Sequence, residues 1–304
     1  MTATVDVSVV IPTIGRPELA RAYRSVKAQN VTGVRIIVVL DAPRRERSVR
    51  AMLDDDTTLV VTEGRRGGAA ARNAGLDHVT SEYVAFLDDD DWWDQDKLEQ
   101  QWEMVECTGA SLCFTAVDFV DGDRHRVLPE ETFDPTRESI ASYLVRRPRL
   151  RHGHGYLQSS TLLARSDLAR RVRWDASLAK HQDWDYVIRL MDDPESVFAF
   201  CGAPLVHVQK GSMASVSATR DRGASEQWLD RHAEALDSTA RGDFIATQLL
   251  RSSLATNDVR GVVESVKRFR RSRPSPAAVV VGLFGAAESL RARRAASAGR
   301  VSSR

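Results

Sequence analysis

The sequence has few cysteines, and their spacing forms no metal or redox motif. Cys107, Cys113 and Cys201 are its three cysteines, and no two of them form CxxC. An odd, sparse set indicates reduced thiols in a cytosolic protein and argues against a disulfide framework. We therefore expect a cytoplasmic protein, and its 42% hydrophobic and 28% charged residues are ordinary for a chain with a sizeable apolar core.

Long apolar runs and a secretion signal are also lacking. The opening residues, MTATVDVSVVIP, have no basic region and no small-residue cleavage site, and their pattern is typical of a strand. The longest apolar run of the C-terminal part, residues 277–287, has eleven residues and is too short to cross a bilayer. We expect it to form either a core helix or a helix at a membrane interface.

Two phosphate-binding motifs are absent as well. The stretch GRRGGAAARNAG at residues 64–75 does not match GxGxxG, and GxxxxGK[ST] occurs nowhere. A dinucleotide-binding fold and a P-loop NTPase therefore lose support. A tight turn followed by a closely packed helix accounts for the small residues of this stretch, but not for Arg72.

Charge of one sign is not in excess over the whole chain, but it is unevenly distributed. Residues 260–304 contain ten Arg and one Lys against two Glu, a net +9, so the first 259 residues carry about −8 of the total of +1. We expect no nucleic-acid binding, because the chain has no basic domain with interleaved aromatics. The basic tail suits either peripheral contact with the inner face of the plasma membrane or a solvated helix packed on the rest of the chain.

The first half of the sequence alternates strand and helix patterns. Apolar, β-branched runs predict strands at residues 6–11, 34–40, 57–62 and 83–87, with helices between them at 17–29, 46–53 and 69–78. Such units predict an α/β fold with a Rossmann-like, mostly parallel sheet and helices on both faces. Helical patterns at 226–236 and 243–254 predict a C-terminal helical appendage.

Polar segments follow each of these strands. They are Pro12-Thr13, Asp41, the turn at 64–68 and the four aspartates 88–91. Ligands bind beyond the carboxyl ends of parallel strands, and Mg²⁺ and Mn²⁺ take one or two carboxylates plus substrate phosphates. The pattern therefore predicts a metal–diphosphate site. The alternative, capping of the next helix by Asp91 or Asp94, explains one or two of the aspartates but not four.

Five segments together resemble a family 2 glycosyltransferase of the GT-A type. They are VSVVIPTIGRPELARAYRSVKAQ (7–29), IIVVLDA (36–42), GGAAARNAGL (67–76), YVAFLDDDDWW (83–93) and HQDWDYVIRL (181–190). The resemblance implies a GT-A catalytic domain at 1–222, with a nucleotide-sugar half up to about 115 and an acceptor half at 116–222. A helical region with a basic tail follows at 223–304.

The implied activity is inverting transfer from a nucleotide-diphosphate sugar, UDP or dTDP first, to an unknown acceptor hydroxyl, in polysaccharide or glycoconjugate biosynthesis. Family roles at matching positions give a set of nucleotide-binding residues: Pro12, Thr13, Asp41, Arg72, Asp88 and Asp89. The resemblance implies that Asp90 and Asp88 bind Mg²⁺ or Mn²⁺ and that Asp91 supports the loop. A late family histidine maps to Gln209 or Lys210, which leaves nearby His207 as a candidate ligand.

The resemblance places the catalytic base at Asp183. This carboxylate would take the proton of the acceptor hydroxyl as its oxygen attacks the anomeric carbon opposite the diphosphate. Gln182 stands where the family has Glu, and we expect the loss of that like charge to make Asp183 easier to ionise. Alternatively, residues 182–191 are only an amphipathic helix with acids in its first turn.

Further expectations concern the acceptor side. Trp93, Gln182 and Arg189 are its candidates, although Trp93 also suits a core position and Arg189 an ion pair with a nearby acid. A polar stretch at 210–222 predicts a lid, and the loop at 151–160 contains an HxH that suits either a metal or an acceptor loop. The rival functions are a nucleotidyltransferase and an inactive nucleotide- or carbohydrate-binding module.

Overall fold

A computed structural model describes residues 3–151, 155–209 and 221–301, with side chains up to 290. The chain forms two compact units. The first comprises residues 1–132 and 156–215, and the second comprises 133–155 and 216–304. Residues 133–155 thus belong with the C-terminal helices, a division that differs from a single boundary near 222. The predicted lid at 210–222, except for its last two residues, and the HxH histidines lie outside the described residues.

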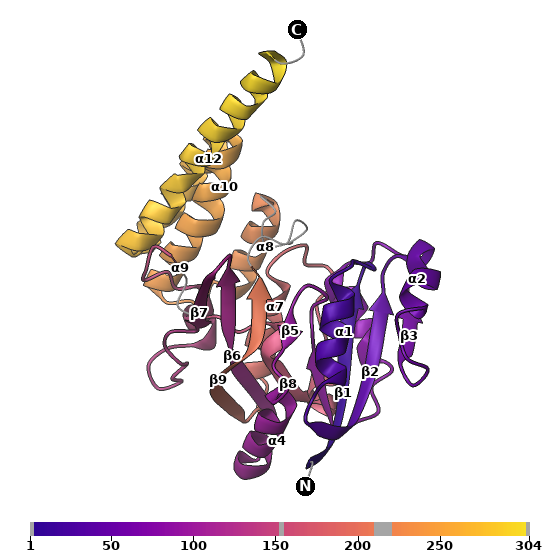
Figure 1. Cartoon of the computed structure of the whole chain (residues 1–304). Coiled ribbons are helices and arrows are strands. Elements are labelled where there is room, and N and C mark those ends of the chain that lie inside the picture. Colours follow the sequence, from indigo (N-terminus) through magenta and orange to yellow (C-terminus); the bar gives the residue numbers. More distant parts are fainter. Residues whose placement is uncertain (1–2, 152–154, 210–220, 302–304) are drawn as a thin grey trace. The chain divides into compact units, whose positions relative to one another are not determined.

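The first unit is built on one sheet, which has nine strands in the described part of the chain. Their spatial order is β3-β2-β1-β4-β8-β6-β9-β5, with β7 paired to β6 (Figure 1). The strands are β1 (Ala3–Thr13), β2 (Val31–Leu40), β3 (Thr58–Val61), β4 (Tyr83–Phe86), β5 (Trp92–Trp93), β6 (Leu112–Asp121), β7 (Arg124–Leu128), β8 (Leu162–Arg165) and β9 (Phe198–Gln209). Strands β1 to β4 pair in parallel, and β8 runs antiparallel to both β4 and β6. The predicted α/β fold is confirmed.

Helices cover both faces of this sheet. They are α1 (Leu19–Lys27), α2 (Glu46–Arg50), α3 (Gly68–Leu76), α4 (Lys97–Thr108), α6 (Ser166–Val172) and α7 (Gln182–Met191). Helix α1 buries Leu19 and Val26 in the cluster that contains Val9 of β1. Helix α3 packs on the opposite face, where a Cβ on Gly75 would lie 2.4 Å from Cγ1 of Val10. Gly75 is thus required by the close approach of helix to sheet, as its small-residue pattern predicts.

Strand β1 extends further than its sequence predicts. It continues through Pro12, which pairs with Val39 of β2, and ends at Thr13. Proline is tolerated there because β4 pairs with β1 only as far as Val10, so no strand on that side needs the missing N–H. The early end of β4 also frees the chain after Phe86 to turn across the carboxyl edge of the sheet.

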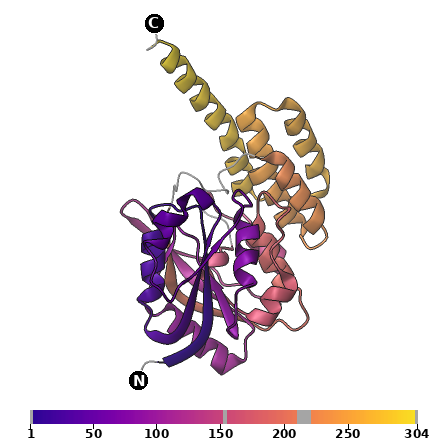
Figure 2. The same ribbon diagram turned by 90° about the vertical axis from the view of Figure 1, so that its right-hand side faces the viewer.

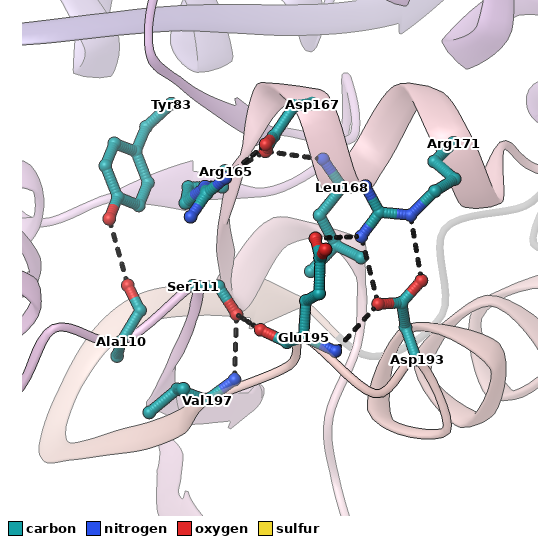
Figure 3. A network of polar contacts seen from close by, with 10 residues as sticks. All are labelled: Tyr83, Ala110, Ser111, Arg165, Asp167, Leu168, Arg171, Asp193, Glu195 and Val197. Carbon is teal, nitrogen blue, oxygen red and sulfur yellow. Dashed lines mark hydrogen bonds and ion pairs between the residues drawn. The ribbon is translucent and has the colours of Figure 1, made fainter.

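A network of polar contacts lies at the opposite end of β4 from this edge (Figure 3). Arg171 of α6 donates to Asp193 at 2.9 Å and to Glu195 at 2.9 Å. The hydroxyl of Tyr83, the first residue of β4, donates to the Ala110 carbonyl at 2.9 Å. The Ser111 hydroxyl, which donates to the Glu195 carbonyl at 3.4 Å and accepts from the Val197 N–H at 2.8 Å, joins the start of β6 to the chain that follows α7. The ion pairs of Arg171 are exposed enough to add little stability.

The second unit is helical. Its elements are α5 (Ile140–Val145), α8 (Arg222–His232), α9 (Ser238–Phe244), a π-helix (Ile245–Leu250), α10 (Arg251–Thr256), α11 (Val259–Arg268) and α12 (Pro276–Val301), seen as adjacent helices in Figure 2. Helices α9, π and α10 form one continuous run, and Phe244 in it stacks on the buried Trp228 with ring centroids 4.8 Å apart. The predicted helical appendage is confirmed, with α8 starting four residues earlier than the pattern at 226 indicates.

Candidate active site

Four consecutive aspartates follow β4, and the turn divides them by burial. The side chains of Asp88 and Asp90 are 30% and 24% exposed. Asp89 and Asp91 are each 6% exposed as residues. The two exposed carboxylates are thus separated by one buried carboxylate, which is the spacing predicted for a diphosphate and metal site.

Asp91 supports the loop, as predicted. Its Oδ2 accepts hydrogen bonds from Ser160 Oγ at 2.6 Å and from Gln158 Nε2 at 3.3 Å. Burial, with Asp88 nearby, raises the pKa of Asp91 well above its usual range. The capping alternative is wrong for this residue, because helix α4 starts only at Lys97 and has no side-chain cap.

Asp89 holds the loop that follows β1. Its carboxylate accepts from Thr13 Oγ1 at 2.6 Å and pairs with Arg16 at 3.4 Å. Burial outweighs these contacts and raises the pKa of Asp89 to about 6. Arg16 also lies 3.3 Å from Asp90 Oδ2, so one guanidinium spans two of the four aspartates. Two residues predicted to bind nucleotide, Thr13 and Asp89, are therefore bonded to each other.

Arg72 of α3 lies at the centre of the site, with its side chain 7% exposed. It forms an ion pair with Asp88 and donates to Ser159 Oγ at 3.2 Å. Its guanidinium carbon also lies 4.6 Å from the ring centroid of Trp174. Burial alone would lower the pKa of Arg72, but the charges of Asp88 and Asp183 outweigh it and raise that pKa.

Asp183 lies in the first turn of α7, beside this pair. Ser159 donates hydrogen bonds to its carboxylate, while the buried Oδ1 has no hydrogen-bond partner among the described residues. Burial raises the pKa of Asp183; Arg72 opposes the shift and Asp88 adds to it. The expectation that Gln182, in place of Glu, makes Asp183 easier to ionise stays a prediction, because burial sets the direction of the pKa shift. Replacing the family's Glu by Gln182 removes one like charge, but desolvation and Asp88 dominate.

Asp41 organises the entry to α3. Its Oδ1 accepts from the Thr62 hydroxyl and from the Arg66 N–H at 3.0 Å, and its Oδ2 accepts from the Gly67 N–H at 2.9 Å. The carboxylate fixes the turn that presents the N-terminus of α3, the helix that carries Arg72. Its predicted contact with the nucleotide base stays a prediction.

Two acceptor-side candidates have structural roles instead. Trp93 is 3% exposed, donates from Nε1 to the Ser160 carbonyl at 2.9 Å and lies under the amine of Lys97. A role in stacking on a sugar is wrong for Trp93, because its ring is enclosed by the core. Arg189 donates to Asp185 at 2.6 Å, which confirms the alternative ion pair. Gln182 donates to the Leu178 carbonyl at 2.6 Å, and its acceptor-side role stays a prediction.

His207 lies on β9 beside Trp92. Its ring stacks on Trp92 at 5.1 Å between centroids, and its Nδ1 lies 3.2 Å from Asp118 Oδ2. The other face of Trp92 carries Arg21, 3.7 Å from the ring centroid, which also donates to the Asp90 carbonyl at 2.9 Å. Within the described residues no group of three or more His, Cys, Asp or Glu side chains is arranged to hold a metal by itself.

Several residues of the site carry no signal in the sequence. Arg16 and Arg21 fall in the first helix–loop segment, where arginine is common. Ser159 and Ser160 belong to a short turn, Ser159–Thr161, before β8. Only the arrival of the antiparallel strand β8 beside β4 brings this turn against Asp88 and Asp91.

Known proteins share this sequence pattern and this fold. The chain is 28% identical over 243 residues to the amylovoran biosynthesis glycosyltransferase AmsB of Erwinia amylovora, covering 74% of this chain and 77% of AmsB. Among solved structures, S. aureus TarS 1–349 in complex with UDP-GlcNAc has a TM-score of 0.61 at 13% identity, covering 94% of this chain and 89% of that one. The mannosyltransferase PcManGT of Pyrobaculum calidifontis, in complex with GDP-Man and Mn²⁺, has a TM-score of 0.50 at 15% identity over 100% and 82% of the two chains.

These similarities establish the GT-A fold, and a family assignment rests on the sequence itself. The sequence model described as Glycosyl transferase family 2 matches residues 8–172, more than half of the chain. That range includes Thr13, Asp41, Arg72, the four aspartates and the Ser159–Thr161 turn. The chain is a glycosyltransferase and belongs to glycosyltransferase family 2.

Proposed function

We propose that this enzyme moves a sugar from a nucleotide-diphosphate sugar to an acceptor hydroxyl with inversion, and that Asp183 is the general base. The observation that carries the proposal is the carboxylate of Asp183, whose buried Oδ1 has no hydrogen-bond partner among the described residues. Buried polar atoms are rarely left unbonded without a reason, and an acceptor hydroxyl is the partner that the family's chemistry provides.

The electrostatics of the site suit this role. A general base works best when its pKa lies near the operating pH, and burial raises the pKa of Asp183 toward neutrality. The charge of Arg72 opposes this shift and favours the ionised carboxylate that a base requires. The acceptor oxygen forms its bond to the anomeric carbon while its proton passes to Asp183. The bond to the diphosphate breaks on the opposite face, so an α-linked donor gives a β-linked product.

A divalent cation fits the exposed carboxylates. Among the described residues, the side-chain partner of the Asp90 carboxylate is the partly exposed Arg16. Mg²⁺ or Mn²⁺ is commonly held by one or two carboxylates plus substrate phosphates. Asp90 and Asp88 would hold it, with His207 as a further candidate. Bound there, a cation would neutralise charge on the leaving diphosphate. The complex of PcManGT with GDP-Man and Mn²⁺ supports this part of the proposal.

Donor binding is assigned to the carboxyl edge of the sheet. The residues proposed for it are Pro12, Thr13, Asp41, Arg72, Asp88 and Asp89. Arg72 is a cation already paired with Asp88, and a donor diphosphate would compete with Asp88 for it. UDP and dTDP come first as donor nucleotides, and the UDP-GlcNAc complex of TarS supports a uridine donor. Acceptors of the polysaccharide type are supported by the name of AmsB.

Thermal shifts test the donor site directly. The wild type, Asp90→Ala and Glu195→Gln are heated with UDP, dTDP or GDP, each with and without Mn²⁺. Glu195 is the control because its carboxylate is 67% exposed and lies in the network of Figure 3. A ligand at about 100 times its Kd adds about 2.7 kcal/mol, a rise of several degrees. We expect a metal-dependent rise in the wild type and the control but not in Asp90→Ala, whereas a wild type unmoved by every nucleotide would overturn the donor site.

A further inference from the structure

Helix α12 turns its large apolar side chains outward. Val280, Leu283, Phe284 and Leu290 are 40%, 55%, 46% and 58% exposed. Leu283 and Phe284 follow Val280 by three and four residues, and Leu290 follows Leu283 by seven, so the four side chains lie on one face of the helix. We call these four residues the apolar face of α12. Single exposed apolar residues are common on soluble proteins, but a continuous row over three turns marks an interaction surface.

The inward side of α12 consists mostly of small residues. A Cβ on Gly282 would lie 2.7 Å from the Ala246 carbonyl oxygen, and one on Gly285 would lie 2.2 Å from that of Arg251. The helix backbone therefore packs directly on the π-helix and α10, beside which it runs in Figure 1. Rotating α12 to bury its apolar face would force bulky side chains into space that admits only glycine, so the outward face is built into the packing.

Helix α11 likewise exposes apolar side chains and buries small residues. Val259, Val263 and Val266 are 75%, 48% and 56% exposed, while Gly261 and Ser265 are buried. A Cβ on Gly261 would meet Ser253 Oγ at 2.5 Å, so this helix also approaches its neighbour through a small residue. Both α11 and α12 expose apolar side chains and bury small residues. The exposure is therefore a shared feature of the two helices and not an accident at one side chain.

Basic residues flank the apolar face of α12 on both sides in the sequence. Lys267, Arg270, Arg271 and Arg273 precede it, are exposed, and have no ion pair within the described part of the chain. Arg291, Arg293, Arg294 and Arg300 follow it. An apolar face that follows a run of exposed cations, with further arginines after it in the sequence, matches an anionic lipid surface, where each Lys or Arg near the headgroups adds about 1 kcal/mol. A second copy of this chain would instead bring two basic borders together.

We propose that the second unit binds an anionic lipid bilayer peripherally, with the apolar face of α12 in the interface and Arg270, Arg271 and Arg273 on the headgroups. No helix among the described residues is long and apolar enough to cross a membrane. Binding parallel to the surface is the mode available to a helix with one apolar face. The proposal rests on the second unit and does not depend on the assignment of the donor site or the base.

Vesicle sedimentation with the full chain tests this docking. The probes are vesicles of phosphatidylcholine and phosphatidylglycerol at a molar ratio of about 7:3, and of phosphatidylcholine alone. We expect binding to the anionic vesicles that weakens as salt rises. Phe284→Glu should weaken it about ten-fold or more, since one large apolar side chain is no longer buried. Arg270→Gln/Arg271→Gln/Arg273→Gln should weaken it by on the order of a hundred-fold.

A matched control and a solution measurement keep the test decisive. Val127 of β7 is 48% exposed, comparable to Phe284, and Val127→Glu should leave vesicle binding unchanged. All variants change exposed side chains, and their melting temperatures verify folding. The proposal is overturned if the wild-type protein does not bind the anionic vesicles. The proposal is also overturned if the wild type is a dimer and Phe284→Glu makes it monomeric without changing vesicle binding. The apolar face of α12 would then join two copies of the chain.

Discussion

The two units depart from ordinary protein burial in opposite ways. In the first unit, charged side chains are buried beside one another: Asp89, Asp91 and Arg72 are each 6% exposed. In the second unit, apolar side chains are exposed, with Leu283 at 55%. Buried charges and exposed apolar rows are the two deviations that carry information, because exposed charges and buried apolar residues are the norm.

Buried charges and exposed apolar side chains place different demands on the stability of the fold. A buried charge needs compensation inside the protein, so Arg72, Asp88 and Asp183 depend on one another, and altering one member disturbs the rest. An exposed apolar side chain needs nothing from the fold, so it can be changed without consequence for folding. Variants should therefore have large and coupled effects at the buried charges of the first unit, and almost none at the exposed apolar side chains of the second.

The largest effect is expected at the base. Asp183→Asn should lower kcat about 10²- to 10⁴-fold, because the acceptor proton loses its recipient. The Kd for the donor nucleotide should change little. Initial rates of sugar transfer and nucleotide titrations provide the measurement, with the exposed Glu195→Gln as the control. Near-wild-type turnover would remove Asp183 from the mechanism.

Arg72→Met should cost about 3–5 kcal/mol of unfolding free energy, because it leaves Asp88 and Asp183 without their cation. Arg171→Met is the matched variant, since this arginine also bridges two carboxylates but is 45% exposed (Figure 3). Its cost should stay below about 1 kcal/mol. Urea unfolding measures the loss of unfolding free energy in both variants. Equal losses would mean that burial of the arginine does not decide the cost of removing it.

The raised pKa of the buried Asp89 makes the free energy of unfolding depend on pH. Its pKa is about 6 in the fold against 3.8 for the free side chain, so its protonated form is favoured by folding. That stabilisation is complete below about pH 4 and is lost as pH rises through 6. Relative to the wild type, Asp89→Asn should gain about 3 kcal/mol of unfolding free energy between pH 4 and pH 8. Urea unfolding in the presence of a chelator measures this, and a difference that does not vary with pH would refute it.

The smallest effect is expected on α12. Leu283→Ser should change the free energy of unfolding by less than about 0.5 kcal/mol, because its side chain is already in water. Leu249→Ala, at a fully buried position of the same unit, should cost about 2–5 kcal/mol. Urea unfolding again measures both. A large loss at Leu283 would mean that this side chain is covered by protein.

Much of the first unit could be predicted from its sequence. β-Branched runs locate β1 to β4, and parallel topology brings Thr13, Asp41 and the aspartates to one edge before any coordinates are known. The pattern 182–191 locates α7 and gives Asp183 its place in the first turn. These features follow from local periodicity and chain order, which a sequence displays.

Other features depend on contacts that periodicity does not display. Adjacent aspartates look alike in a sequence, yet one turn exposes Asp90 and buries Asp89 against Thr13. The raised pKa of Asp183 reflects desolvation, which only packing reveals. Ser159 and Trp174 come from segments without a regular pattern, and they join the site because β8 runs antiparallel to β4. For residues 277–287 the sequence predicts either a core or an interfacial helix, and the close packing of Gly282 and Gly285, which turns large apolar side chains of α12 outward, is a contact that periodicity does not display.

The pairing of the Ser159–Thr161 turn with the aspartates has a consequence for biosynthesis. Strands β1 to β4 are complete by residue 86, and domains can begin to fold while later residues are still being translated. Asp91 and Asp88, however, meet their partners only after Ser159 and Ser160 have emerged, and Asp183 follows later still. On a nascent chain shorter than this, Asp91 lacks the burial that raises its pKa in the folded unit. The burial that raises the pKa of Asp183 is thus acquired only after residue 183 of 304 has been made, in the second half of synthesis.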